Sequence, residues 1–152
     1  MIAKRKINQI QNFTQKILRK SGKRGMSLKE LAKDNCSEIS RLAGCFALKS
    51  WRGTAVYVLK GDCVFGRKQS HEILAIQEGE KVYVLDPSVW QFFFRKKSIL
   101  VGDADNILGA IKLTKGVYKG SWKISEKLLL KDCKKKQTEW LSVICQNNTE
   151  SC

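Results

Sequence analysis

The first third of the chain repeats apolar residues every three or four positions, which is the period of an α-helix. Between residues 5 and 20 the apolar side chains are Ile7, Ile10, Phe13, Ile17 and Leu18. This spacing predicts an amphipathic helix that ends before Ser21-Gly22.

Two helix starts follow in quick succession. Ser27 with Glu30 has the pattern of a capping box, and Asn35 with Glu38 repeats the pattern as Asn-x-x-Glu. The apolar residues behind the second box keep helical spacing and are Ile39, Leu42, Ala43, Phe46, Ala47 and Leu48. We therefore expect a short helix and then a longer one, in which Cys36 is the first helical residue.

The middle of the chain is richer in β-branched and aromatic residues. The composition of residues 55–59, 71–77 and 80–86 favours strands, and Glu78-Gly79 joins the last two in a hairpin. Beyond Pro87 the pattern predicts a strand at 98–101, a helix at 105–113, a strand at 121–124, a helical turn at 125–130 and a buried element at 140–145. Helices followed by mostly antiparallel strands indicate the α+β class.

Length and composition favour one domain. A chain of 152 residues, 43% of them hydrophobic, can bury a core, and it has one proline and no Ser/Gly/Pro-rich tract that could serve as a linker. We therefore expect a single domain over 1–152, with residues 1–25 as a basic N-terminal helical extension. The formal net charge of +15 favours an acidic partner, although a run of charge is more often a solvated face.

The sequence lacks the marks of a secretory leader, a membrane span or a metal site. Polar residues follow the basic start, and no apolar run approaches the length of a membrane span. The six cysteines are irregularly spaced, so we expect mostly free thiols, and with one histidine we expect no metal or cofactor. The expectation is a soluble protein that works in a reducing cytosol, its own or that of a target cell.

Cys36 is the candidate nucleophile. Unpaired backbone N–H groups at the first turn of a helix favour negative charge, and therefore the thiolate. Cys45 lies deeper in the same predicted helix, where no such field acts. For Cys36 taken alone, the role of a small buried hydrophobic side chain has equal weight.

His71 is the candidate base, because it is the single histidine of the chain. If Glu78-Gly79 is a two-residue turn, Gln77 pairs with Glu80, and counting outward places His71 opposite Asp86. Side chains paired in this way share one face of the sheet, which would let the carboxylate reach Nδ1 of the imidazole. The alternative is a strand-end histidine beside an aspartate that caps the turn before Pro87.

These residues carry a resemblance to a known group of enzymes. The segments 71–76 and 81–88 resemble the His-strand and Asp-Pro signature of transglutaminase-like and papain-like enzymes, notably bacterial effector and toxin deamidases and peptidases. Asn35-Cys36-Ser37-Glu38 resembles their nucleophile motif, and the similarity spans residues 34–94. The span from Cys36 to His71 is short for a papain-like peptidase, and no tryptophan follows the cysteine.

The resemblance implies a papain-like core and a triad of Cys36, His71 and Asp86. Its members attack a carboxamide with the thiolate, protonate the leaving ammonia or amine with the histidine, and orient that histidine with the aspartate. A glutamine deamidase of the toxin or effector kind is the first expectation, with a peptidase or a transglutaminase as alternatives. The implied partners are a protein substrate and an acidic immunity or inhibitor protein.

The backbone N–H of Cys36 is the first candidate donor to an oxyanion. The second donor stays unassigned, since the upstream glutamines, Gln9, Gln11 and Gln15, lie on the first predicted helix.

Two other classes of function compete with the enzymatic one. The positive charge permits a nucleic-acid-binding module or a ribonuclease that uses His71 with lysines, although no nucleic-acid motif is present. A purely structural or interaction protein is the third hypothesis.

Overall fold

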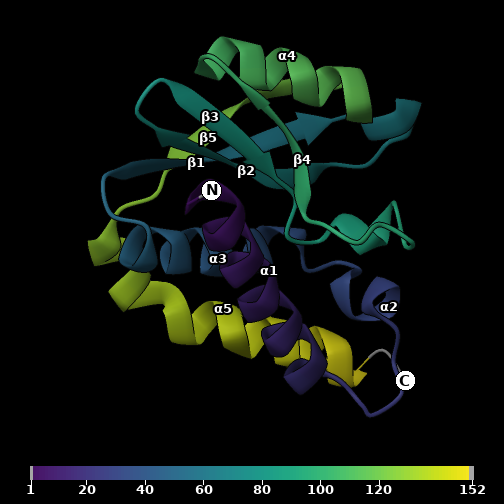
Figure 1. The fold of residues 1–152 in the computed structure, drawn as a ribbon. Coiled ribbons are helices and arrows are strands. Elements are labelled where there is room, and N and C mark those ends of the chain that lie inside the picture. Colours follow the sequence, from purple (N-terminus) through teal and green to yellow (C-terminus); the bar gives the residue numbers. More distant parts are fainter. Residues whose placement is uncertain (1, 151–152) are drawn as a thin grey trace.

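The computed structural model describes residues 2–150, with the side chains of residues 3–149 (Figure 1). The elements are α1 (Ile2–Ser21), α2 (Leu28–Ala32), α3 (Cys36–Ser50), β1 (Thr54–Asp62), η1 (Val64–Gly66), β2 (His71–Glu78), β3 (Lys81–Leu85), η2 (Val89–Gln91), β4 (Leu100–Ala104), α4 (Ile107–Tyr118), β5 (Ser121–Lys127) and α5 (Leu130–Glu150). Here η1 and η2 are single turns of 3-10 helix.

The strands form one antiparallel sheet between two helical layers. Its order is β4-β3-β2-β1-β5, with α1, α3 and α5 on one side and α4 on the other (Figure 1). Helices outside an antiparallel sheet confirm the predicted α+β class.

The central strand β2 is buried on both faces. Leu74 and Ile76 belong to the core under α1 and α3, whereas Ile73 and Ala75 belong to the core under α4. Successive side chains of a strand point to opposite faces, so a strand between two helical layers must be apolar at nearly every position. The continuous apolar run in residues 73–76 thus has a structural explanation.

The helix predictions hold for the first half of the chain, with one exception in the capping. Ser27 and Glu30 form the predicted capping box. Asn35 makes no side-chain cap to α3; its amide nitrogen donates to Leu31 O at 2.8 Å and to Asn148 Oδ1 at 3.0 Å. Asn35 therefore ties α5 to the start of α3, which a local pattern could not reveal.

The hairpin turn lies one residue later than predicted. Glu78 pairs with Lys81, so the loop is Gly79-Glu80, and Gly79 takes a φ of +58° that a glycine adopts without strain. The register therefore shifts by two positions, which keeps every side chain on its predicted face. His71 is consequently not opposite Asp86, because the β2–β3 ladder stops at the pair Leu74–Leu85 and includes neither residue. On its other edge, His71 pairs with Gly61 of β1.

The C-terminal predictions need larger corrections. The predicted strand at 98–101 lies at Leu100–Ala104, and the predicted helix at 105–113 extends to Tyr118. The helical turn expected at 125–130 is wrong, because β5 continues to Lys127. The element expected at 140–145 is the middle of the long helix α5.

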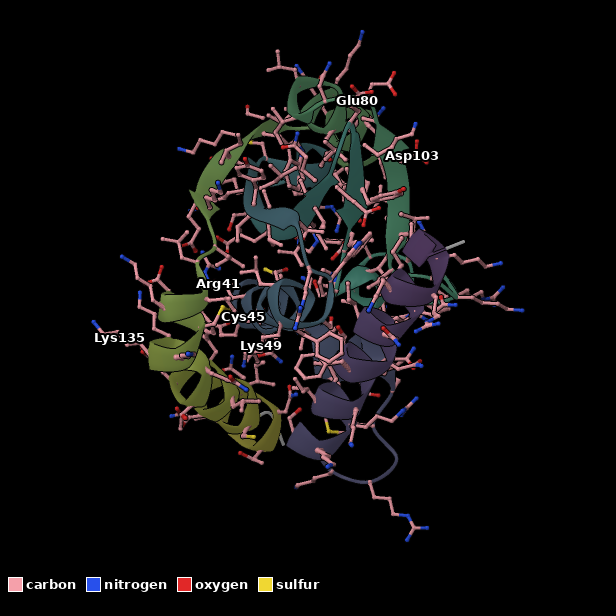
Figure 2. All side chains as sticks on the ribbon, turned by 60° about the vertical axis from the view of Figure 1, so that its left-hand side comes forward. Arg41, Cys45, Lys49, Glu80, Asp103 and Lys135 are labelled. Atoms are coloured by element: carbon pink, nitrogen blue, oxygen red, sulfur yellow. A yellow bond between two sulfur atoms is a disulfide. The ribbon has the colours of Figure 1, made fainter. Side chains whose placement is uncertain are left out.

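Two of the cysteines expected as free thiols are joined. Cys45 of α3 and Cys133 of α5 form a disulfide, on the side of α3 that faces α5 (Figure 2). Cys36, Cys63 and Cys145 are free, and Cys152 lies outside the described residues. Helix packing brings together two positions 88 residues apart, so spacing along the sequence gave no sign of this bond.

Within residues 2–150, none of the helices combines the length and apolar character needed to cross a bilayer.

The disulfide should contribute strongly to stability. It closes a loop of 88 residues, and such a cross-link lowers the entropy of the unfolded chain. We expect the Cys45→Ala/Cys133→Ala variant to lose about 3–4 kcal/mol in the free energy of unfolding, measured by denaturant titration. The exposed thiol of Cys63 provides the control, since Cys63→Ala should leave that value unchanged. Equal stability of the two variants would contradict the prediction.

Candidate active site

Cys36 is the first residue of α3, as predicted, and its side chain is half-buried. The helix packs against β1 and β2, which places its first turn near the start of β2. His71 is the first residue of β2 and is completely buried. The fold therefore brings the predicted nucleophile and the predicted base to one end of the α3–β2 contact.

His71 and Asp86 form a buried ion pair. Nε2 of His71 lies 2.8 Å from Oδ2 of Asp86, and both side chains are 0% exposed. The bond uses Nε2 rather than the expected Nδ1, because Asp86 lies beyond the end of β3 instead of across a ladder from His71. The backbone N–H of Asp86 donates to Ile99 O at 2.8 Å, which fixes the residue at that point.

Asp86 receives further hydrogen bonds from two residues that the sequence analysis missed. The backbone N–H of Ser88 and its hydroxyl both donate to Oδ1, at 3.0 and 3.2 Å. The hydroxyl of Tyr118 donates to Oδ2 at 2.5 Å. The Asp-Pro-Ser run is a turn signal that could have suggested Ser88. Tyr118 is the last residue of α4 and carried no comparable signal.

These contacts keep the Asp86 carboxylate charged. Burial favours its neutral form, but the positive charge and hydrogen bond of His71, with the bonds from Tyr118 and Ser88, hold the pKa of Asp86 below its usual value. The same carboxylate, together with burial, raises the pKa of the Tyr118 hydroxyl, which stays a donor.

His71 carries the matching positive charge. Burial alone would lower the pKa of the imidazole, but the charge and hydrogen bond of Asp86, followed by the interaction with Cys36, raise it to about 10. Asp86 takes Nε2, so Nδ1 is the ring nitrogen left for the thiol. Nδ1 is buried and has no hydrogen-bond partner among the described residues. The ring thus has the carboxylate on one nitrogen, and Cys36 is near enough to influence its pKa.

Aromatic rings surround the imidazole. Phe92 meets it edge-on with centroids 4.7 Å apart, and the rings of Tyr118 and Trp122 lie at 5.5 and 6.4 Å. Trp122 needs the glycine at position 61, since a Cβ there would lie 2.4 Å from the indole. This shell keeps water from competing for the ion pair.

A second ion-pair network ties the neighbours of Cys36 to the neighbours of His71. Arg41 donates to both carboxylate oxygens of Glu72, at 3.0 and 3.2 Å, and to the backbone oxygen of Ser37 at 3.0 Å. It also pairs with Glu126 of β5 at 2.7 Å. Because Ser37 follows Cys36 and Glu72 follows His71, this bidentate clamp sets how the two residues lie relative to each other.

The amide of Gln11 bonds to the segment before β4. Its nitrogen donates to Lys97 O at 2.8 Å, and its oxygen accepts from the backbone N–H of Ile99 at 3.0 Å. Gln11 therefore helps to position the segment that holds Asp86, and no contact assigns it as an oxyanion donor.

Over residues 2–150, no cluster of three or more His, Cys, Asp or Glu side chains could hold a metal ion.

The raised pKa of His71 predicts how stability depends on pH. The pKa is about 10 in the folded protein against 6.5 for the free side chain, so the contribution of His71 is complete below pH 6.5 and is lost as pH rises through 10. The lowered pKa of Asp86 gives a contribution that is present above pH 3.8 and is lost as pH falls further. The imidazole resonances should therefore report a charged ring at neutral pH by NMR.

Asp86→Asn should abolish the positive charge of His71 at neutral pH. Without the carboxylate, burial dominates, and the ring should be neutral at pH 7. We expect a loss of about 3–5 kcal/mol in the free energy of unfolding near pH 6, and a smaller loss near pH 10. A wild-type ring that titrates below pH 7 would contradict the prediction.

Comparison with known proteins gave no match: no family model matches the chain, and neither the curated proteins nor the solved structures include a significantly similar one.

Proposed function

We propose that the protein is a cysteine-dependent amide hydrolase, a glutamine deamidase of the toxin or effector kind that uses Cys36, His71 and Asp86. The observation that carries the proposal is a buried imidazole whose Nε2 is bonded to Asp86, whose Nδ1 has no partner among the described residues, and whose pKa is raised in part by Cys36. A nucleophile, a base and an orienting acid are the groups that thiol-dependent acyl transfer requires.

In the proposed first step, the thiolate of Cys36 attacks the carbon of a carboxamide. The charged His71 supports the thiolate form and then donates its Nδ1 proton to the departing nitrogen, so ammonia leaves and a thioester forms. The backbone N–H of Cys36, at the start of α3, is the proposed donor to the oxyanion.

In the second step, water hydrolyses the thioester. The imidazole, now neutral, accepts a proton from the attacking water, and the C–S bond breaks to return the thiolate and a carboxylic acid. Asp86 stabilises the imidazolium at the start and end of the cycle. Tyr118 and Ser88 act through Asp86 and are positioning residues.

A papain-like core is part of the same proposal. Its support is the order of the elements: a nucleophile at the start of a helix, which packs on an antiparallel sheet whose central strand begins with the histidine. Peptidase and transglutaminase activities need the same thioester and differ in the groups that leave and enter.

The proposed partners are a protein substrate and an acidic immunity or inhibitor protein. The formal net charge of +15 supports an acidic partner, because opposite charges speed association and favour complementary surfaces.

Comparison of the wild type with Cys36→Ala in cells tests the proposal. The intact masses of candidate target proteins should show an amide-to-acid shift in the presence of the wild type. The rate at which the shift appears should fall at least about 1,000-fold with the variant. A fragment would indicate a peptidase, and a cross-linked adduct a transglutaminase.

Cys63→Ala is the matched control, since Cys63 is a free and exposed thiol outside the proposed triad. It should keep full activity. Full activity in Cys36→Ala, together with binding to nucleic acid that collapses as salt is raised, would exclude the thiol mechanism and favour a nucleic-acid function.

A further inference from the structure

A cavity of about 660 Å³ lies between α2, η1 and η2. Its lining includes three cations, Lys29, Lys33 and Arg67, and the rings of Phe65, Phe92 and Phe93, and none of its lining residues is acidic. We call it the cationic cavity.

The cationic cavity adjoins the proposed catalytic residues. Phe92 lines it and also contacts the His71 ring, with centroids 4.7 Å apart. Lys33 lines it and precedes Cys36 by three positions, which limits their Cα separation to about 11 Å. Cys36 and His71 do not line the cavity themselves, but a molecule in it would contact Phe92, which packs on the imidazole, and Lys33, three positions before the thiol.

The positive charges of the cationic cavity are not paired with carboxylates of the described residues. Among the described residues, no carboxylate forms an ion pair with Lys29, Lys33 or Arg67. Lys29 packs over the ring of Phe94, which leaves its charge unneutralised. The side-chain oxygen of Gln91 is buried and has no hydrogen-bond partner among the described residues. The unneutralised charges would attract the carboxylates of an anionic ligand, and the free amide oxygen could accept a hydrogen bond only from an N–H or O–H of that ligand.

We propose that the cationic cavity binds acidic side chains of the protein substrate that flank the glutamine attacked by Cys36. This inference rests on the function proposed above. Carboxylates would pair with Lys33 and Arg67 while the apolar part of the segment packs on Phe65, Phe92 and Phe93. A polypeptide fits better than a nucleic acid, because the adjoining thiol requires an acyl carbon such as that of a side-chain carboxamide.

A binding experiment tests the cavity without relying on turnover. The probe is a fluorescent peptide with one glutamine between aspartates and glutamates, added to Cys36→Ala protein and followed by anisotropy. Reversing two exposed charges, Lys33→Glu and Arg67→Glu, should weaken its binding at least tenfold at low salt. The same peptide with serines in place of its acidic residues should bind weakly to both proteins.

The matched control reverses Lys134 and Lys135 of α5 instead. Both are exposed, and Lys135 projects from α5 far from the sheet (Figure 2). This control has the same net charge as the cavity variant and should bind the acidic peptide as the unreversed protein does. Equal losses in the two variants would mean that overall charge, not the cavity, binds the peptide, and would overturn the proposal.

Polyuridylate at matched charge concentration is the competitor. If it binds more tightly than the acidic peptide and loses this binding in the cavity variant, the cavity serves a nucleic acid and the proposal is overturned. If polyuridylate displaces the peptide only weakly, or displaces it equally from the cavity variant and the control, the result supports the acidic peptide as the ligand of the cavity.

Alkylation of Cys36 tests whether the cavity reaches the thiol. Iodoacetate and iodoacetamide have nearly the same size, but only iodoacetate is charged. The ratio of the iodoacetate rate to the iodoacetamide rate therefore reports the electrostatic potential at the thiol. We expect the cavity variant to lower this ratio about threefold relative to wild type, and the α5 control to leave it unchanged. An unchanged ratio in the cavity variant would separate the cavity from Cys36 and refute a substrate role.

The two proposals fail in different ways. The anisotropy experiment measures bound peptide and not product. Its result for the cavity variant therefore holds even if the protein hydrolyses no amide. Persistent amide hydrolysis in Cys36→Ala would refute the thiol mechanism without affecting those binding results.

Discussion

The ion pair between His71 and Asp86 is the constraint around which this end of the molecule is organised. Both charges are completely removed from water, and such a pair is stable only when further hydrogen bonds replace the lost hydration. Ser88 and Tyr118 supply these bonds from the turn after β3 and from the end of α4. The pair therefore joins the sheet to α4, and the charge state of the imidazole depends on all of these elements being in place.

A separate ion pair positions the helix that carries Cys36 relative to His71 and Asp86. Arg41 lies one helical turn beyond Ser37 on α3, and it grips Glu72, the residue after His71. The disulfide between Cys45 and Cys133 fixes the next turn of the same helix, on the same face as Arg41, to α5. The helix that carries Cys36 is thus anchored at two successive turns, and the proposed reaction needs its first turn to stay in register with the start of β2.

Polarity changes sharply around the imidazole. Aromatic rings enclose it, and one of them, Phe92, also lines a cavity with cations and aromatic rings but no acid in its lining. A protonated histidine beside such a cavity produces a positive region in surroundings of low dielectric, where charge acts over a longer range than in water. The charge of the ring and the cations of the cavity therefore favour an anionic neighbour.

Local patterns were enough to predict α3, β2 and the α+β class, because helical and strand periods are properties of neighbouring residues. They also singled out Cys36 and His71, through a helix start and a unique residue type, whereas Asp86 was predicted from a hairpin register that the structure corrects and from the resemblance of its Asp-Pro segment. The hairpin register was wrong by two positions, since the backbone freedom of Gly79 decides it and periodicity leaves it open. Tyr118, Arg41 and the Cys45–Cys133 bond depend on contacts between distant segments, so only the packing of the helices on the sheet could decide them.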